Sequence, residues 1–221
     1  MTTAKEKDFI EIDYTARTRE ENIIFDTTQE EVAKKEGVHG NHSHYHPAVI
    51  CLGEGMMLKP VEEGLVGKET GKEYSIEIKS EDAFGRKNAK LIQMIPLNKF
   101  RQQKIQPVPG LQLNIDGMFG IVKTVSGGRC YVDFNHPLAG KDLVYSVKIN
   151  KIVEDDREKL KSLLDLHFHM HDAQIELKEG AAAVKTKQNV PKEALEEMKS
   201  IAKRTIPNIK DIEFEIENTK K

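Results

Sequence analysis

The sequence contains no tryptophan and only two cysteines among its 221 residues, and neither sign of charge dominates. Cys51 and Cys130 stand far apart and outside any CxxC pair, which excludes a disulfide framework and a four-cysteine zinc site. The net charge of −2 argues against binding to nucleic acid or to a membrane surface through electrostatics. We therefore expect neither of them as a partner.

Long hydrophobic runs are also missing. No stretch approaches the ~20 apolar residues of a membrane span, and the first residues lack the apolar core of a signal peptide. Together with the sparse cysteines, this predicts a cytoplasmic protein. Hydrophobic residues make up 38% of the chain and charged residues 32%, which is typical of a globular protein with a charged surface.

Apolar and polar residues alternate over residues 9–17 and 74–78, as in half-buried strands. Two further short strands are expected at residues 22–26 and at the apolar segment 48–52. Apolar residues recur at helical spacing over 57–65 and predict one short amphipathic helix. Residues 32–46 show no clean period and are expected to form an irregular loop.

The middle of the chain is rich in apolar residues but is interrupted by prolines. Residues 91–125 therefore predict a small unit of short strands and turns. A piece of this size has little interior in which to bury so many apolar side chains. Strand alternation returns at 143–149.

The last part of the chain predicts a separate α+β unit over residues 153–221. It would consist of a charged helix at 155–165, a hairpin turning at Gly180, a helix after Pro191 and a half-exposed strand at 212–216. Units this small often need a partner to complete their core. We expect this unit to hold the chain as a symmetric homodimer.

Five short pieces occur in one order along the chain. They are Tyr14, Ile24-Phe25-Asp26, the segment from Gly53 to Gly64, Asp82-Ala83-Phe84-Gly85, and the segment from Asn135 to Val147. Their order and spacing resemble the FKBP-type peptidyl-prolyl isomerases, more narrowly the SlyD-like branch in its long archaeal form. The resemblance covers residues ~8 to ~152, the limits at which the composition changes.

The resemblance implies an α+β fold in which an antiparallel sheet wraps a short helix and a small β-rich chaperone domain is inserted in the flap. The expected isomerase domain is 1–85 plus 131–152, the inserted domain is 86–130, and the C-terminal α+β domain is 153–221. The implied activity is cis–trans isomerisation of X-Pro bonds in unfolded or partly folded clients. No cofactor is implied.

The resemblance also implies a dry apolar cup, which disfavours the planar, solvated amide. Carried over by position, the catalytic residues would be Tyr14, Phe25, Asp26, Met57, Leu58, Val61, Phe84 and Tyr145. Asp26 matches the pocket carboxylate of the family, and Leu58 matches the residue whose backbone N–H bonds the peptide. The flap edge would carry His136, Pro137 and Leu138. The alternative is that the aromatic residues are ordinary core residues and Asp26 a turn residue.

Two positions depart from the family pattern. Val61 stands where a tryptophan is usual, and Phe84 where a tyrosine usually reaches the ligand. Both changes make the cup shallower and less polar. We expect isomerase activity with poor binding of the macrolide inhibitors of the family.

The apolar residues of the inserted domain are expected to capture client polypeptides, because exposed apolar clusters often mark binding surfaces. The predicted groove consists of Leu91, Ile92, Met94, Ile95, Phe100 and Val108. The alternative is that these side chains fill the core of their own domain. A holdase with little catalysis is therefore the second hypothesis for the function.

Seven of the eight histidines occur in two clusters and supply a third hypothesis, a metal-binding protein. The clusters are His39, His42, His44 and His46, and then His167, His169 and His171. On a strand, the second cluster would share one face, and imidazole is a common metal ligand. SlyD-like proteins bind nickel or zinc through a histidine-rich tail, whereas this sequence ends in a patterned unit. We therefore assign no metal site and keep the second cluster as candidate ligands.

Overall fold

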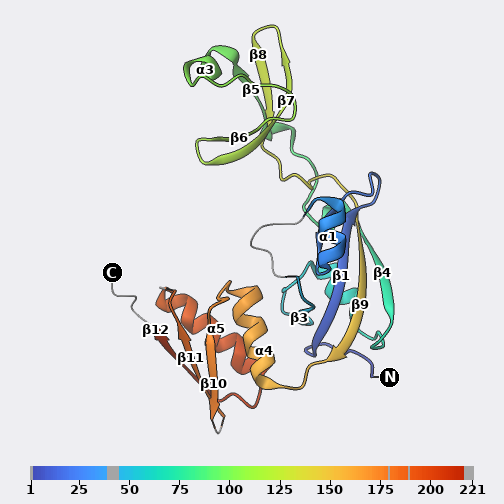
Figure 1. Ribbon diagram of the computed structural model, residues 1–221, viewed down its shortest axis with the longest axis vertical. Coiled ribbons are helices and arrows are strands. Elements are labelled where there is room, and N and C mark those ends of the chain that lie inside the picture. Colours follow the sequence, from blue (N-terminus) through green and yellow to red (C-terminus); the bar gives the residue numbers. More distant parts are fainter. Residues whose placement is uncertain (1, 39–44, 179, 189, 217–221) are drawn as a thin grey trace. The chain divides into compact units, whose positions relative to one another are not determined.

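The computed structural model describes residues 2–38, 45–178, 180–188 and 190–216. The chain divides into two compact units. The first unit combines Met1–Ile78 with Leu143–Lys221, and the second unit is Lys79–Asp142. The fold is α+β, with mostly antiparallel sheets and few helices, as predicted (Figure 1). The division into three domains stays a prediction.

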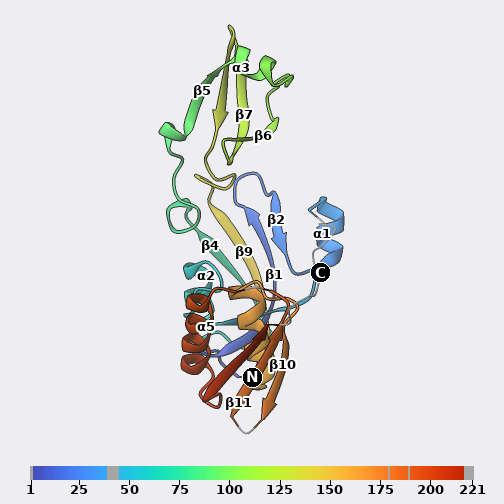
Figure 2. The ribbon, with the colours of Figure 1, turned by 90° about the vertical axis from the view of Figure 1, so that its left-hand side faces the viewer.

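A five-stranded antiparallel sheet organises the first unit (Figure 2). Its strands are β1 (Phe9–Thr18), β2 (Ile24–Thr27), β3 (Ala48–Cys51), β4 (Glu73–Ile78) and β9 (Leu143–Ile152). Their order is β2-β1-β9-β4, and β3 pairs with β1. Strand β9 therefore lies between two strands from the first part of the chain, and Tyr145 stands beside Ala16 and Ile76 in the register.

The short helix α2 (Lys59–Leu65) packs on this sheet, as the helical spacing predicted. Pro60 lies in its first turn, where the missing N–H costs nothing. Gly64 permits the close approach, because a Cβ added there would lie 2.9 Å from Cδ1 of Ile76 on β4. Val61 and Leu65 on the inner face are fully buried.

A second helix, α1 (Glu30–Glu36), occupies the beginning of the segment 32–46, where we expected an irregular loop, so this part of the prediction is wrong. Only Ala33 of this helix is buried, so the sequence has no apolar stripe that would reveal it. Gly37, with φ 70°, takes the left-handed conformation that ends the helix. The rest of that loop, residues 39–44, lies outside the described residues.

The C-terminal part of the first unit follows the sequence prediction closely. It contains α4 (Asp156–Ser162), a π-helical turn η3 (Leu163–His167), β10 (Gln174–Lys178), β11 (Ala181–Thr186), α5 (Lys192–Thr205) and β12 (Asp211–Ile216). The Asp155 side chain caps α4 by accepting the N–H of Glu158 at 2.7 Å. β10 and β11 form the predicted hairpin, and α5 leads into β12, which pairs in parallel with β11.

This C-terminal part shares a hydrophobic core with the central sheet. Phe9 on β1 and Cys51 on β3 belong to the same buried cluster as Leu160, Leu164 and Met170. An ion pair between Arg204 on α5 and the mostly buried Glu54 adds a second connection. Within the described part of the chain, no helix combines the length and apolar character that a membrane crossing requires.

The second unit is a four-stranded antiparallel sheet with one short α-helix. Its elements are η1 (Ser80–Asp82), η2 (Ala89–Leu91), β5 (Ile92–Pro96), α3 (Leu97–Gln102), β6 (Gln112–Ile115), β7 (Met118–Ser126) and β8 (Arg129–Asp133). The strand order is β5-β8-β7-β6. Phe100, Val122, Cys130 and Val132 form the buried core of this unit. Such a core is small, as the length of the unit led us to expect.

Candidate functional site

Three aromatic rings of the first unit lie close together on neighbouring strands. The centroid of the Tyr145 ring on β9 is 6.0 Å from that of Tyr14 on β1 and 6.2 Å from that of Phe25 on β2. The pair of Phe25 and Tyr145 is edge-to-face, a favourable geometry for aromatic rings. The antiparallel register of β2, β1 and β9 brings these rings together, as the resemblance implied.

Asp26 is tied to this cluster by a hydrogen bond. The Tyr14 hydroxyl donates to Oδ2 of Asp26 at 2.8 Å. Burial, and secondly the Asp26 carboxylate, raise the pKa of Tyr14 well above its ordinary value. The same two causes raise the pKa of Tyr145 to about 12. Both hydroxyls therefore keep their protons at neutral pH, and Tyr14 remains a hydrogen-bond donor.

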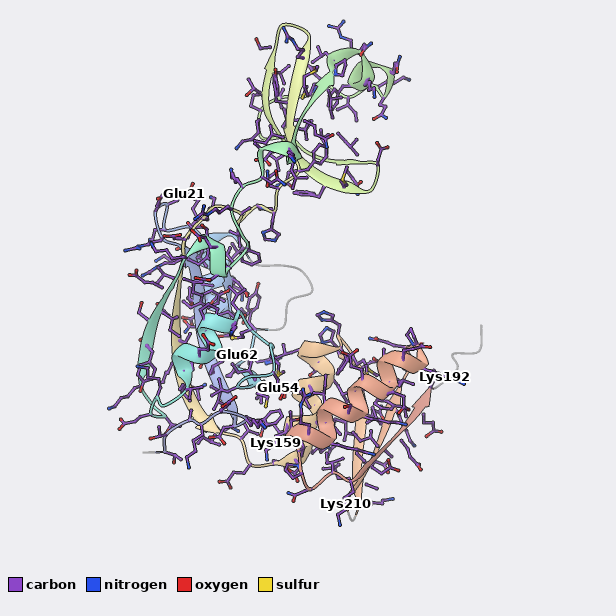
Figure 3. All side chains as sticks on the ribbon, turned by 180° about the vertical axis from the view of Figure 1, so that it is seen from behind. Glu21, Glu54, Glu62, Lys159, Lys192 and Lys210 are labelled. Atoms are coloured by element: carbon purple, nitrogen blue, oxygen red, sulfur yellow. The ribbon has the colours of Figure 1, made fainter. Side chains whose placement is uncertain are left out.

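Glu62 holds the loop before α2 in place, and our sequence analysis did not single it out (Figure 3). The backbone N–H groups of Gly53, Gly55 and Met57 donate to its carboxylate at 2.9, 3.2 and 2.8 Å. The Glu62 side chain is buried, so these bonds replace the water that the carboxylate has lost. Two glycines followed by a glutamate in the first helical turn were the available sequence signal.

Leu58 follows this loop as the N-cap residue of α2. Its carbonyl accepts the N–H groups of Val61 and Glu62 at 2.8 and 3.3 Å. Its own backbone N–H makes no hydrogen bond within the residues that the structure describes. This donor is therefore open to a carbonyl of a bound peptide, and the role that the resemblance implied for it stays a prediction.

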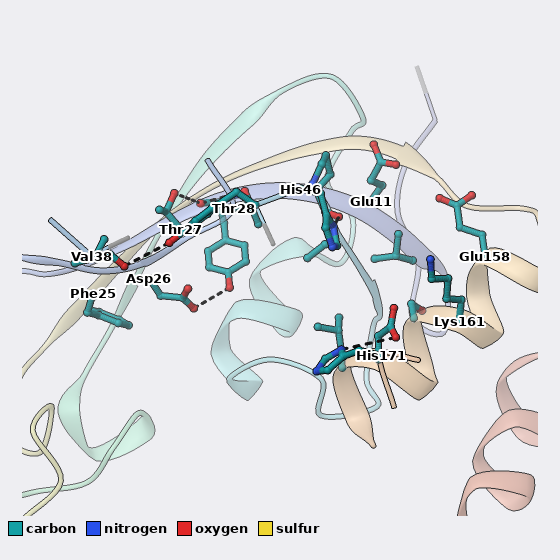
Figure 4. A pocket seen from close by; sticks show the side chains of 18 residues that line it. Glu11, Phe25, Asp26, Thr27, Thr28, Val38, His46, Glu158, Lys161 and His171 are labelled. Atoms are coloured by element: carbon teal, nitrogen blue, oxygen red, sulfur yellow. Dashed lines mark hydrogen bonds and ion pairs between the residues drawn. The ribbon is translucent and has the colours of Figure 1, made fainter. Parts of the chain in front are cut away.

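A cavity of about 810 Å³ opens beside the aromatic cluster. Of the predicted cup, Tyr14, Phe25 and Asp26 line it (Figure 4). Four other predicted residues, Met57, Leu58, Val61 and Tyr145, are absent from its lining. Val61 is fully buried, whereas Met57 and Leu58 are half-buried at the entry to α2.

The C-terminal part of the first unit supplies a wall of this cavity that the sequence analysis did not predict. Its lining includes Glu158, Lys161, Ser162, Asp165 and His171. No local motif marks these residues, because they meet the cup only through the tertiary packing of α4 and η3.

Phe84 and the predicted flap residues belong to the second unit. The rings of Phe84 and His136 stack with their centroids 4.3 Å apart and an interplanar angle of 3°. The backbone N–H of Leu138 donates to Nδ1 of His136 at 3.2 Å, and Pro137 between them is exposed. The catalytic role of Phe84 and the flap roles of the other three residues stay predictions.

Asn135 connects the two chain segments through which the second unit begins and ends. Its side chain accepts the N–H of Asn88 at 2.8 Å and donates to the Asn88 carbonyl at 3.1 Å and to Asp133 Oδ1 at 2.7 Å. These bonds join the outgoing and returning chain of the unit. Burial opposes the ionisation of Asp133, but the hydrogen bonds from Asn135 and the charges of Lys87 and Lys123 together outweigh it and lower the pKa of that carboxyl.

The apolar residues predicted to form a groove in the second unit are divided between surface and core. Ile92, Met94 and Val108 are exposed. Leu91 and Ile95 are half-buried, and Ile95 packs against the core. The predicted exposure of Phe100 is wrong, because this side chain is buried in the core next to the sheet. Met118, Phe119 and Tyr131 are exposed apolar residues that the prediction left out.

The histidines at 167, 169 and 171 do not lie on a strand, the condition under which they would share one face. His167 ends η3, His169 has a positive φ of 55°, and β10 begins only at Gln174. The rings of His169 and His171 are 6.3 Å apart. Among the described residues, no three His, Cys, Asp or Glu side chains are grouped so that they could hold a metal ion. His39, His42 and His44 lie outside the described residues.

Comparison with known proteins agrees with this geometry. A family model described as "FKBP26, IF domain" matches residues 93–138, within the second unit. A short-type peptidyl-prolyl cis-trans isomerase of Methanocaldococcus jannaschii is 29% identical over 154 residues, which cover 70% of this chain and 97% of that protein. The SlyD isomerase of Pasteurella multocida is 28% identical over 57% of this chain and 62% of its own length.

A solved multi-domain immunophilin from Arabidopsis thaliana covers 91% of this chain and 56% of its own, with a TM-score of 0.37 and 14% sequence identity. This similarity is too low to support an argument. A probable FKBP-type 16 kDa peptidyl-prolyl cis-trans isomerase of Pseudomonas fluorescens is 33% identical over 108 residues, which cover 47% of this chain and 71% of that protein. By this similarity, the chain belongs to the family of FKBP-type peptidyl-prolyl cis-trans isomerases.

Proposed function

We propose that this chain isomerises X-Pro peptide bonds at the cluster of Tyr14, Phe25, Asp26 and Tyr145, and that its second unit holds unfolded client segments. Rotation about a peptide bond faces a barrier of ~20 kcal/mol and takes tens of seconds or more for X-Pro without catalysis. The hydrogen bond from Tyr14 to Asp26, within reach of two further aromatic rings, is the observation that carries the proposal.

The chemistry requires no nucleophile. An amide that rotates loses its resonance, so an apolar surface that takes the proline ring out of water favours the twisted form over the planar, solvated one. In this chain, the rings of Phe25 and Tyr145 supply the apolar surface. The open N–H of Leu58 would orient the peptide by donating to one of its carbonyl groups.

A proline-peptide isomerisation assay tests the proposal. We expect Asp26→Ala and Tyr145→Ala each to lower kcat/KM by about tenfold or more, the size of effect that a loss of ~1.4 kcal/mol in transition-state binding produces. Glu20→Ala is the matched control, because this carboxylate is exposed on the turn between β1 and β2 and lies outside the cavity. Full activity in both cup variants would contradict the assignment.

The second unit favours an additional holding function. Along β5, Ile92 and Met94 point to the same side of the sheet, and Met94 pairs with Tyr131 on β8. The exposed Phe119 lies on β7, the next strand in the order. Exposed apolar side chains concentrated on a small unit are typical of a surface that binds other proteins.

A refolding assay separates the enzyme from a pure holdase. Catalysis predicts that substoichiometric amounts of the protein accelerate a proline-limited refolding reaction. A holdase with little catalysis predicts no acceleration, or slower refolding. Because clients reach the cup more often when they are held nearby, acceleration of protein refolding is also expected to exceed that of short peptides.

We also propose that the chain forms a homodimer. The outward face of the C-terminal sheet carries charged residues such as Glu176, Lys185 and Glu213, which do not favour apolar association. Strand β12 pairs with β11 on one side, and within the described residues no strand pairs with its other side. We therefore propose pairing through β12. A single monomeric mass in light scattering over a wide concentration range would contradict it.

A further inference from the structure

The cavity beside the cup has a second wall that belongs to the C-terminal part of the chain. Figure 4 shows Phe25 and Asp26 at one end of the cavity and Glu158 and Lys161, both from α4, at the other. Its volume of about 810 Å³ falls near the upper end of the roughly 300–1,000 Å³ that ligand pockets span. A proline ring in the cup would therefore leave room for neighbouring residues of the same client.

Acidic side chains outnumber basic ones along this cavity. Four carboxylates line it, from Glu11, Asp26, Glu158 and Asp165, against the single lysine Lys161. Two histidines, His46 and His171, also line the cavity. An excess of carboxylates attracts ligand groups of the opposite sign. The lining therefore favours a cationic group over an anionic one.

Three of these carboxylates already have donors. Glu11 and Glu158 share the ammonium group of Lys151, at 3.3 and 3.2 Å. Asp26 accepts the hydroxyl of Tyr14 at 2.8 Å. These bonds occupy Glu11, Glu158 and Asp26 before any client arrives.

Asp165 differs from the other three. Its carboxylate accepts no hydrogen bond from the described residues. Its Oδ1 lies 3.8 Å from Nδ1 of His171, at the long end of an ion-pair distance. The side chain is only 24% exposed. Burial raises the pKa of Asp165 above its ordinary value, although Lys161 and two histidines oppose this effect. A half-buried carboxylate without a close donor would gain from a cationic partner.

We propose that the second wall is a client subsite and that Asp165 accepts a lysine or arginine side chain of the client near the isomerised proline. This inference rests on the proposed isomerase function, because the subsite lies in the cavity that the cup opens into. A lysine or arginine side chain is the cationic group that a client polypeptide itself supplies. Asp165 would then determine client specificity without taking part in the rotation itself.

Peptides that differ only near the proline test the subsite. In each flanking position in turn, the peptide carries Lys, Ala or Glu, and kcat and KM are measured for the full chain. We expect the wild type to prefer the Lys peptide in at least one position, mainly through a lower KM. Asp165→Asn is expected to reduce the Lys-to-Glu ratio of kcat/KM roughly two- to fivefold, the range that a partly exposed ion pair supports.

Two further variants separate the subsite from a structural effect. Lys161→Gln removes the exposed cation of the same wall and is expected to raise the Lys-to-Glu ratio, opposite to Asp165→Asn. Glu154→Gln changes the net charge equally at an exposed residue outside the cavity, and is the matched control. Circular dichroism and thermal unfolding check that each variant is folded.

The outcomes are distinguishable. Opposite shifts of the ratio in Asp165→Asn and Lys161→Gln, with no shift in Glu154→Gln, support the subsite. If Asp165→Asn lowers kcat/KM equally for the Lys, Ala and Glu peptides, or leaves the Lys-to-Glu ratio of kcat/KM unchanged, the proposed subsite is overturned while the isomerase function stands. If the wild type accelerates none of the peptides, the proposed function fails, and the subsite fails with it.

Discussion

In the first unit, the aromatic side chains of the cup lie against one another and against the central sheet, whereas several of the largest apolar side chains of the second unit face solvent. Tyr145 is 5% exposed, and Met94 on β5 is 49% exposed. Tyr14 and Phe25 are half-buried, so all three rings are at least partly covered within the first unit. The core of the second unit consists of four buried residues, with further apolar side chains only partly buried against it.

The two units therefore differ in which apolar side chains maintain the fold and which face solvent. In the second unit, both kinds occur within one small sheet, so composition alone does not separate them. Substitutions at buried and exposed positions of both units test this distinction.

The largest effect is expected from Phe100→Ala, which empties the core of the second unit. Truncating a fully buried phenylalanine costs roughly 3–5 kcal/mol, close to the whole stability of a small unit. Phe119→Ala is the matched control, because that ring is exposed and its loss should change stability by about 0.5 kcal/mol or less. Hydrogen exchange of the β7 and β8 amides measures the stability loss in both variants. Equal losses would contradict the distinction between buried and exposed apolar residues.

Glu62→Gln tests the organised loop of the first unit. The amide group of glutamine cannot accept hydrogen bonds through its nitrogen, so at least one of the three loop N–H groups loses its partner. We expect a loss of about 1–3 kcal/mol in the free energy of unfolding, with a lower kcat/KM for proline peptides. The neighbouring Glu63→Gln is the control, since Glu63 is exposed and, among the described residues, forms an ion pair with Lys59 alone, at 3.5 Å. The two variants should differ clearly in urea denaturation.

The exposed apolar residues of the second unit are tested by Met94→Ser combined with Phe119→Ser. Because client capture depends on accessible apolar area, we expect suppression of client aggregation to fall several-fold. Thr124→Ser, on the same sheet, provides a control that changes little apolar area. Light scattering of an aggregating client measures the effect. Undiminished suppression would mean that clients bind elsewhere.

The smallest effect concerns the buried Tyr145 hydroxyl at alkaline pH. Its folded pKa is raised from 10.0 to about 12, so the stability that this group contributes is complete below pH 10 and is lost as pH rises towards 12. At pH 11 the loss amounts to roughly 1 kcal/mol. Tyr145→Phe cannot lose a proton there, and its stability should fall less between pH 10 and 11. Urea denaturation at the two pH values measures the difference, and identical declines would contradict the shift.

Much of the local structure was readable from the sequence. Alternation predicted β1, β4 and β9, helical spacing predicted α2, and the order of helix, hairpin, helix and strand after residue 153 was correct. These patterns are readable because a half-buried element must repeat its apolar residues with its own period. Helix α1 has one buried residue and therefore left no such pattern.

Tertiary structure decided which residues face one another. Phe100 looked like its exposed apolar neighbours in the sequence, yet the turn into α3 places it in the core. The histidines from 167 to 171 alternate, yet the chain turns there through η3 and a positive φ instead of forming a strand. Local sequence does not encode these differences, because they depend on where the surrounding elements pack.

The family of the chain and the strands that carry Tyr14, Phe25 and Tyr145 were predicted from the sequence, whereas the pairing of those strands brings the three rings together. Only the tertiary structure brought Lys161 and Asp165 to the same cavity. These residues stand more than a hundred positions after Tyr14, and they reach it because α4 packs into a core shared with Phe9 and Cys51. Burial of that apolar surface, which no short segment encodes, places the second wall beside the cup.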